Sequence, residues 1–374
     1  MGSAEIMDGS LCASLPSYLT GVISAAGIRP ESRTGQRAQW DATLEQMPYI
    51  PVTYTNARID YQLAYQQGHG GDWWDLSLVL IHDLRPCGVW PLTFSIKDGT
   101  PAMTSYGGPV LPPLFVDGLL EKTRKTLVKG CLDLIESLCR AGGVLKYESG
   151  ESFQGASRAG VSDWHDQSMR LGACALLRHE MFVDLSMSLQ DLKSRFRKSY
   201  KSLVTSGTRM WKVHVTAEAD PIVWGEFREL HRSVSGRVTR SAESWDLQHQ
   251  AIAARQSFLV SLRDNRGRLV GGGLFDCTRD EGEYSVGAYD RALFDKPLGH
   301  VVQYRAIEEM KARGLRWYKL GYRPYRGQDP QATDKEISIG EFKHGFATHV
   351  FPRYLLRAQH GAVGSADQTQ RMTS

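Results

Sequence analysis

The sequence predicts a mixed α/β fold of the α+β type, made of two tandem units, each a mainly antiparallel sheet flanked by helices. A chain of 374 residues is long enough for two domains. Hydrophobic residues make up 41% of it, which is typical of globular proteins and excludes a disordered or fibrous chain. One order of elements, three strands followed by a helix and a further strand, occurs twice. We expect an accessory or disordered N-terminus, a first domain, a second domain with the active cleft, and a disordered tail, at 1–38, 39–180, 181–356 and 357–374.

The second half shows this order most clearly. Three runs rich in apolar and β-branched residues are separated by tight turns, which predicts an antiparallel meander. Its strands are expected at 257–263, 268–277 and 283–290. A helix is predicted over 299–313, because apolar residues recur there at every fourth position and Gly314 is a natural C-terminal stop. A strand at 316–320 follows.

The first half repeats this order. A helix is predicted over 116–140, and strands are expected at 75–83, 88–97, 102–110 and 144–147. Two short matches relate the halves, because Ser105–Gly108 corresponds to Ser285–Ala288 and Gly142 corresponds to Gly314. These matches predict a tandem duplication of one unit. The alternative is a chance similarity of two meanders.

Charge and cysteine content exclude several classes of protein. There are 45 Lys and Arg residues against 41 Asp and Glu, a net charge of +4, which excludes a strongly basic nucleic-acid coat but leaves a local patch open. None of the six cysteines forms a C-x-x-C pair, so we expect no metal, and scattered cysteines indicate a reducing, cytoplasmic location. Glu5 and Asp8 occupy the place where a secretory signal is positively charged, and no run is apolar enough to span a bilayer. We therefore expect no integral membrane association.

One stretch is strongly basic, although the positive and negative charges of the whole chain nearly balance. Residues 191–212 carry seven lysines and arginines and a single acid, Asp191. Lys193, Arg197 and Lys201 recur every four residues, so one helix would present them on one face. That face suits the phosphates of a nucleic acid or of a nucleotide-linked substrate, and the alternative is an ordinary solvated face.

Three segments in the second half carry a resemblance to a known family. They are Lys296–Ile307 with its KPLG and QYRAI runs, Gly314–Gly321 (GLRWYKLG), and Gly340–Phe346 (GEFKHGF). A three-strand meander followed by such a helix and strand resembles the GNAT N-acyltransferase fold. Two GNAT-like units in tandem resemble the Fem-type, peptidoglycan bridge-forming aminoacyltransferases and other FemAB-related proteins. The resemblance covers roughly residues 40–355 and is strongest over 283–346, and the coiled-coil arm of some members is missing.

The resemblance implies a reaction and a catalytic pair. Family members move an aminoacyl group from aminoacyl-tRNA to an amine on a cell-wall precursor, and related proteins of this fold use acyl-CoA. The family's Phe-Lys pair, associated with stabilising the tetrahedral intermediate, corresponds to Phe342 and Lys343. The alternatives are a core aromatic for Phe342 and an exposed lysine beside the final strand for Lys343. Acyl transfer to an amine needs little more than orientation and a donor to the oxyanion.

Further candidates surround the helix at 299–313. Asp290, after the third strand, is a candidate to accept the amine proton, with a turn role as the alternative, and Tyr289 lies beside it. Gly299 begins the helix, where free N–H groups can bind phosphate. His300, Gln303 and Tyr304 follow within the first turns and are candidates to bind substrate, or are ordinary polar residues of that helix.

Two more groups of residues are candidates to bind anions. Tyr322 and Arg323 lie in the loop after the last strand of the unit, and such loops often carry sites. Arg197 and Lys201 of the basic stretch are the remaining candidates for phosphate or nucleotide binding. An ordinary charged surface loop and a solvated helix face are the alternatives.

The function expected from the sequence is that of an N-acyltransferase. It would move an acyl or aminoacyl group onto an amine of a cell-envelope, polysaccharide or metabolite precursor, with no bound cofactor. The donor, aminoacyl-tRNA or acyl-CoA, stays open, and so does the acceptor, a small or nucleotide-linked molecule. The chain has no G-x-S-x-G or H-E-x-x-H motif. The alternative is a non-catalytic binding or scaffold protein that retains the duplicated fold.

Overall fold

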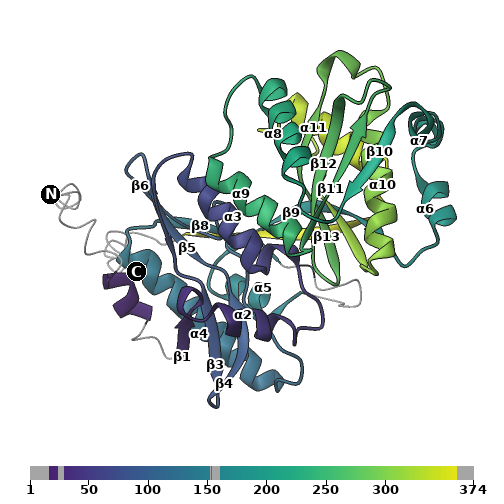
Figure 1. The fold of residues 1–374 in the computed structure, drawn as a ribbon. Helices are drawn as coiled ribbons and strands as arrows, with labels where there is room; N and C mark the ends of the chain where they lie inside the picture. The colour runs from purple at the N-terminus through teal and green to yellow at the C-terminus, as the bar shows by residue number, and fades with distance from the viewer. Residues whose placement is uncertain (1–16, 24–28, 152, 154–160, 360–374) are drawn as a thin grey trace, which may run out of the picture.

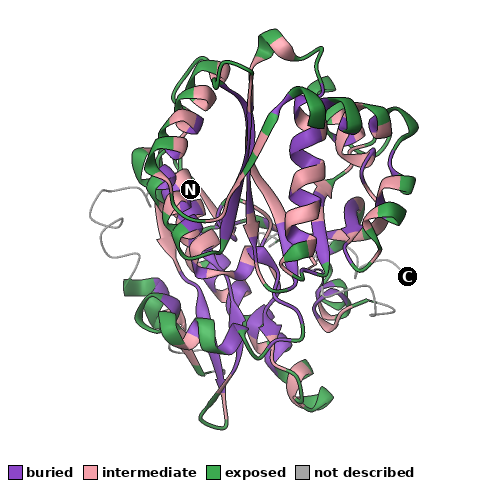
Figure 2. Ribbon diagram, turned by 45° about the vertical axis from the view of Figure 1, so that its right-hand side comes forward, coloured by how far each residue is buried: buried purple, intermediate pink, exposed green. Residues whose placement is uncertain are grey.

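The computed structural model describes residues 17–23, 29–151, 153 and 161–359. They form two lobes, which we call the first unit, from β1 to α5, and the second unit, from β9 to β15 (Figure 1). The expected fold class is confirmed, because the chain folds into mainly antiparallel sheets with helices packed against them. Strands at the centre of each lobe are buried, while the outward faces of the helices are exposed (Figure 2).

The largest sheet has eight strands in the order β10-β11-β12-β13-β14-β9-β15-β8. Its strands are β8 (Lys146–Ser149), β9 (Cys174–Asp184), β10 (Lys212–Thr216), β11 (Ser257–Arg263), β12 (Leu269–Cys277), β13 (Glu281–Tyr289), β14 (Trp317–Tyr322) and β15 (His349–Gln359). All neighbouring strands are antiparallel except β13 and β14. The helices of the second unit are α6 (Leu189–Arg195), α7 (Lys198–Met210), α8 (Pro221–Ser235), α9 (Ala242–Ala253), η3 (Arg291–Leu293), α10 (Leu298–Ala312) and α11 (Asp334–His344).

The first unit contains two smaller sheets, with orders β1-β3-β4-β7 and β2-β5-β6. Its strands are β1 (Arg29–Ser32), β2 (Asp72–Asp75), β3 (Leu78–His82), β4 (Arg85–Trp90), β5 (Thr93–Lys97), β6 (Thr100–Thr104) and β7 (Leu114–Phe115). Its helices are η1 (Arg33–Gly35), α2 (Arg37–Leu44), η2 (Val52–Tyr54), α3 (Asn56–Gln67), α4 (Glu121–Ala141) and α5 (Asp163–Arg170). The long helix α4 buries one apolar face in the core of this unit, which includes Leu132, Ile135 and Leu138.

The two units share the large sheet. The C-terminal strand β15 pairs with β9 of the second unit on one side and with β8 of the first unit on the other. Strand β9 runs across the boundary expected at residue 180, and β15 extends to Gln359, beyond the end expected for the second domain. At the other end of the chain, β1 pairs with β3, and Arg33 is buried among Asp75, Asn56 and Asp60. Residues 29–38 therefore belong to the first unit, whereas 1–16, 24–28 and 360–374 lie outside the described residues.

Elements of the second unit lie close to where the sequence predicts them, but three expectations for the first unit are wrong. The strand expected at 88–97 is two strands in different sheets, because the chain turns at Pro91, which has no N–H for a ladder. The strand expected at 102–110 ends at Thr104, since Tyr106 and Gly107 have positive φ and form a turn. Ser105–Gly108 therefore does not correspond in structure to the strand residues Ser285–Ala288. The helix expected from 116 begins at Glu121, after Gly118 with a φ of +86°.

The basic stretch is not one helix. Helix α6 ends at Arg195, and Phe196 takes an extended conformation with its ring buried in the core of the second unit, so that α7 begins afresh at Lys198. Lys193 therefore lies on a different helix from Lys201, and Arg197 caps the start of α7. The continuous basic helix face expected from the spacing is absent.

Candidate active site

The strands β13 and β14 separate part of the way along the large sheet. They pair in parallel only at Glu281–Trp317, Gly282–Tyr318 and Glu283–Lys319. Beyond this point β13 continues along β12, while β14 shifts register against β9 between Lys319 and Gly321. We call this place, where the two strands diverge, the splay. A splay between neighbouring strands leaves backbone groups without a ladder partner, so a substrate can hydrogen-bond to them.

Lys343 reaches into the splay from the last turn of α11. Its Nζ lies 5.8 Å from the centre of the Tyr284 ring on β13. A Cβ placed on Gly321 of β14 would lie 3.7 Å from the same Nζ. The side chain is half-buried, and burial lowers the pKa of Lys343 while the charge of Glu283 opposes that shift. The helix is held in this position by a capping box, in which Thr333 and Glu336 satisfy each other's backbone N–H groups.

Phe342, the neighbour of Lys343, is a packing residue. Its ring contacts the rings of Tyr200, His300 and Phe346, with centroids 5.8, 5.2 and 5.6 Å away. It also lies against Gly299 in the first turn of α10, where a Cβ would approach the ring to 3.1 Å. Phe342 therefore anchors the end of α11 on α7 and α10, which fixes Lys343, and it covers the first turn of α10.

A row of charged side chains crosses the sheet beside the splay. Lys319 Nζ lies 3.9 Å from Glu283 Oε2 and 3.5 Å from Glu180 Oε1. Glu180 is 2% exposed, and its other oxygen lies 3.5 Å from Nε of Arg353 on β15. From the first unit, Arg58 of α3 lies 3.5 Å from Glu283 Oε1. We call these five residues the charge row.

These contacts favour the ionised forms of Glu283 and Lys319. Burial by itself would raise the pKa of Glu283, but Lys319, Arg58 and Lys343 outweigh it and hold that pKa below its usual value. Burial would lower the pKa of Lys319, but Glu180 and Glu283 raise it above its ordinary range. Glu283 Oε2 is buried and accepts no hydrogen bond from a described residue. Among the described residues, this oxygen is paired only with Lys319 Nζ, at 3.9 Å.

Arg58 joins this row to the rest of the interface between the units. Its guanidinium donates to Asp276 Oδ2 at 2.9 Å and to Ser285 Oγ at 3.0 Å. Nearby, the fully buried Glu281 accepts hydrogen bonds from Tyr49 Oη at 2.8 Å and from the Val52 N–H at 3.0 Å. The first unit therefore contributes directly to the surroundings of the splay.

Tyr289 and Asp290, expected at the end of β13, lie where the strand turns into η3. Tyr289 Oη is 3.1 Å from Tyr284 Oη, and this pair requires Gly287, because a Cβ there would overlap the Tyr284 hydroxyl. The Asp290 carboxylate accepts from the Ala292 N–H at 3.0 Å and pairs with Arg268 at 2.8 Å. These contacts give Asp290 the role of a turn residue.

The candidates on α10 face different surroundings. The ring of His300 lies 4.5 Å from that of Tyr200, and burial, helped by Arg197, lowers the pKa of His300 to about 4. Gln303 is buried and accepts a hydrogen bond of 2.5 Å from Tyr318 Oη. Tyr304 contacts Phe196 and lies under Lys193 on α6. His300 and Gln303 therefore support the packing behind the splay.

The remaining candidates lie on either side of α11. Tyr322 is 45% exposed and is covered by the guanidinium of Arg178 at 5.5 Å. Arg323 pairs with Glu341 at 2.6 Å, and Arg197 contacts the same carboxylate at 3.2 Å. Lys201, one turn into α7, forms no ion pair with a described residue.

Several groups of this site were missed in the sequence. Glu283 and Lys319 lie in strands whose other residues are largely apolar, and a charge inside an apolar run is the signal that could have found them. Arg58 and Glu180 carry no such signal. Packing of the two units brings Arg58 to the splay, and the register of β9 against β14 brings Glu180 there.

A groove lies on the first-unit side of the charge row. It has a volume of about 480 Å³ and runs between the segment before α4 and residues 351–354 of β15. Pro112, Phe115, Phe153 and Trp164 form apolar walls, and Arg353 connects the groove to the charge row.

The described residues contain no cluster of three or more His, Cys, Asp and Glu side chains that could hold a metal ion. Within the same part of the chain, no helix has both the length and the apolar character required to cross a bilayer.

Comparisons with known proteins agree with the geometry. Residues 190–330 match the family model of the acetyltransferase (GNAT) domain. The solved structure of FemX is similar over 85% of this chain and 95% of its own, with a TM-score of 0.62 and 14% identity. L-PGS from Bacillus licheniformis is similar over 87% of this chain and 93% of its own, with a TM-score of 0.54 and 13% identity. No curated protein matches the chain.

These findings confirm the resemblance stated from the sequence. At such low identity the two structures establish a shared fold, which extends over both units. The family model covers α6 to β14, including the splay. The second unit therefore contains a GNAT domain, and the chain as a whole has the Fem-type fold of tandem GNAT-like units.

Proposed function

We propose that this protein is an N-acyltransferase that joins an acyl or aminoacyl group to an amine of a cell-envelope, polysaccharide or metabolite precursor. The reaction would take place in the splay, with Lys343 as the catalytic residue. The observation that carries the proposal is the position of the Lys343 ammonium between Tyr284 of β13 and Gly321 of β14, two strands that lie within the residues matching the GNAT domain.

Lys343 suits the charge that develops during acyl transfer. The acceptor nitrogen attacks the carbonyl carbon, and the carbonyl oxygen becomes an oxyanion. A half-buried ammonium held by α11 stabilises this oxyanion more strongly than an exposed one, because the surroundings exclude water. The C–N bond forms in this attack. When the oxyanion collapses to a carbonyl, the bond to the leaving group breaks, and the leaving group takes up the proton lost by the amine.

Glu283 is suited to position the acceptor amine. Its Oε2 is ionised, lies 3.9 Å from Lys319 Nζ and accepts no hydrogen bond from a described residue, and Glu283 lies on the same strand as Tyr284. A carboxylate of this kind binds an ammonium or amine N–H directly. The groove of about 480 Å³ beyond Arg353 would hold the body of the acceptor.

Two observations favour charged tRNA over acyl-CoA as the donor. The first turn of α10, where a diphosphate would meet free N–H groups, is covered by the ring of Phe342. On α7 and at the start of β10, four basic side chains form no ion pair with a described residue and can meet a phosphate backbone. These are Lys198, Lys201, Arg209 and Lys212.

The test measures turnover of the purified chain with aminoacyl-tRNA and acyl-CoA donors and a panel of amines. We expect Lys343→Ala to lower kcat about 10²–10³-fold, as the loss of one oxyanion donor does elsewhere. Lys335→Ala is the matched control, because Lys335 lies exposed on the same helix. Ribonuclease should abolish the activity of the tRNA-dependent reaction.

Full turnover in Lys343→Ala would overturn the proposed role of this lysine. Absence of transfer with every donor, together with binding of a ligand that Lys343→Ala leaves unchanged, would favour the non-catalytic scaffold instead.

A further inference from the structure

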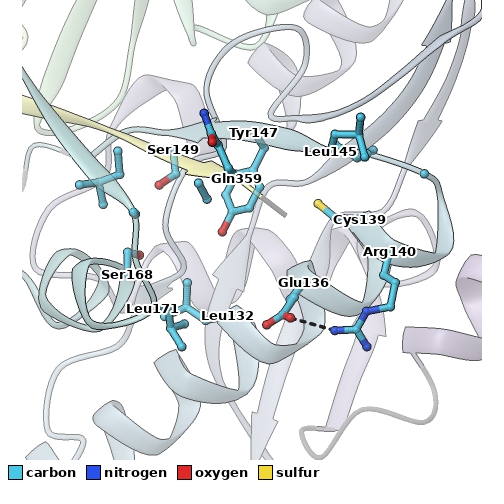
Figure 3. Close-up of a pocket in the computed structure, with 15 residues that line it drawn as sticks. Leu132, Glu136, Cys139, Arg140, Leu145, Tyr147, Ser149, Ser168, Leu171 and Gln359 are labelled. Atoms are coloured by element: carbon cyan, nitrogen blue, oxygen red, sulfur yellow. Dashed lines mark hydrogen bonds and ion pairs between the residues drawn. The ribbon is translucent and has the colours of Figure 1, made fainter. Parts of the chain in front are cut away.

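A second cavity lies between the first unit and the end of β15, and it shares no residue with the splay or the charge row. It has a volume of about 610 Å³ and opens between the C-terminal half of α4, strand β8, the end of α5 and the last residues of β15 (Figure 3). This size is within the range of small-molecule sites. The proposal below therefore goes beyond acyl transfer and does not depend on it.

The inner wall of this cavity is apolar. Leu132 and Cys139 of α4, Val144 after it and Leu356 of β15 are all at most 2% exposed. Burial raises the pKa of Cys139 to about 12, so its thiol is neutral and behaves as part of that wall. At the mouth, Leu171 keeps 63% of its surface exposed. The cavity therefore suits a ligand with an apolar body.

Polar atoms are placed at defined points of this apolar wall. Ser168 of α5 is 5% exposed, and its Oγ has no hydrogen-bond partner among the described residues. The Tyr147 side chain extends from β8 toward α4, on which Glu136 lies (Figure 3). An unpaired buried hydroxyl is costly, so a hydrogen bond to a ligand that reaches it would stabilise Ser168.

The charged side chains that line the cavity are one acid and one base. Glu136 and Arg140 lie one turn apart on α4 and pair at 2.8 Å, with 44% and 75% of their side chains exposed (Figure 3). An exposed pair of this kind is weak and exchanges easily for other partners. Such a rim is neutral as a whole, and it offers a carboxylate to a cation and a guanidinium to an anion at the same time.

From this arrangement we propose that the cavity binds a short apolar peptide as a zwitterion. Its ammonium group pairs with Glu136, its carboxylate pairs with Arg140, and its side chains lie against the apolar wall. A backbone carbonyl of the peptide accepts the hydrogen bond of Ser168 Oγ. A simple amine or fatty acid would satisfy one charge of the rim and leave the other.

The first experiment measures binding to the full-length protein by calorimetry, with the dipeptide Leu-Leu as the probe. Hexylamine, hexanoate and Gly-Gly serve as comparisons, since each lacks one charge or the apolar body. We expect Leu-Leu to bind at least roughly tenfold more tightly than each of them, because each loses a charged hydrogen bond or the apolar contact. Equal binding of hexylamine or hexanoate, or no binding of Leu-Leu, would overturn the proposal.

The second experiment uses variants of the rim. Glu136→Gln and Arg140→Gln should each weaken the binding of Leu-Leu roughly tenfold. Asp133→Asn is the matched control, because the Asp133–Lys129 pair lies on the same helix with the same spacing and does not line the cavity. Leu171→Trp, at the exposed mouth, should block binding. Unchanged binding in Glu136→Gln and Arg140→Gln would show that the rim does not recognise the ligand.

Discussion

The two units contain the same crossover, a strand, a long helix and a parallel strand, but they fill the space beside it differently. In the second unit, β13 and β14 flank α10 and pair at three positions before they diverge. In the first unit, Val110 and Ser149 flank α4 and form a single parallel bridge. Lys343 reaches into the splay of the second unit, and the charge row lies beside it. Beside the bridge of the first unit, Trp164 Nε1 donates to Ser149 Oγ, and the surrounding core side chains are mainly apolar.

This difference separates two uses of one architecture. Apolar filling stabilises the first unit without leaving reactive groups. Charged filling in the second unit costs desolvation, and under the proposed function the ionised groups would act on a reacting carbonyl in a place that holds little water. The predictions below test this separation, from the largest expected effect to the smallest.

Lys319→Met should have the largest effect on stability. The change leaves Glu180 and Glu283 with one partner fewer in a buried place, and breaking such a pair costs about 3–5 kcal/mol of the free energy of unfolding. Urea denaturation measures this loss. Adding Glu180→Gln should restore part of it, and no recovery in the double variant would contradict the assigned coupling.

Leu138→Ala tests the apolar side of the comparison. Removal of this buried side chain from α4 should lower the free energy of unfolding by about 2–5 kcal/mol, as for other aliphatic core residues. Turnover per folded molecule should stay unchanged, because Leu138 lines neither the splay nor the groove. A large fall in kcat at a temperature where the variant is folded would contradict the separation of roles.

The pH dependence of stability should depend on Glu281 at the junction of the units. Burial raises the pKa of Glu281 to about 7, so the folded protein binds a proton that the unfolded chain has released. This contribution to stability is present below the unfolded pKa and is lost as the pH rises through about 7. His231 and His300, with pKa values lowered to about 4, act in the opposite direction only below about pH 6.5.

The stabilising contribution of Glu281 should therefore be lost as the pH rises from about 4.5 to about 7. Over that range the free energy of unfolding of Glu281→Gln should rise relative to that of the unchanged protein, which thermal denaturation measures. Glu218→Gln is the control, since Glu218 is largely exposed. An equal slope in Glu281→Gln and the unchanged protein would exclude Glu281 as the group responsible.

The smallest effect is expected for single basic residues of α7. Lys201→Gln should weaken tRNA binding modestly and reduce the slope of log K against log salt by about 1, if one phosphate contact is lost. Filter binding at several salt concentrations measures that slope. Lys97→Gln, on β5 of the first unit, is the control, and an equal reduction there would contradict a specific role for α7.

The sequence predicts the second unit better than the first for physical reasons. The first two strands of its meander, β11 and β12, are long and largely apolar runs, and the local sequence is enough to predict such runs as strands. In the first unit, Pro91 and the positive φ of Tyr106 break runs that look continuous, and their effect depends on the sheets around them. Lys343 could be identified from its motif, whereas Glu180 and Arg58 reach the same place through contacts far apart in sequence.

The break between α6 and α7 is another place where the sequence pattern alone predicts the wrong structure. Charges at every fourth position predict one basic face, but the periodicity of charge does not detect a buried aromatic such as Phe196, which ends a helix by entering the core. At Phe196, tertiary packing overrides the single helix that the local charge pattern predicts.

Because β15 closes the large sheet after the GNAT domain is complete, the two units cannot be separated by cutting the chain. A shortened protein ending after α11 would leave β9 with an open edge along residues 174–182 and would detach β8 from its neighbour. A fragment of this kind invites aggregation, so expression trials and gene fusions should keep the last strand intact.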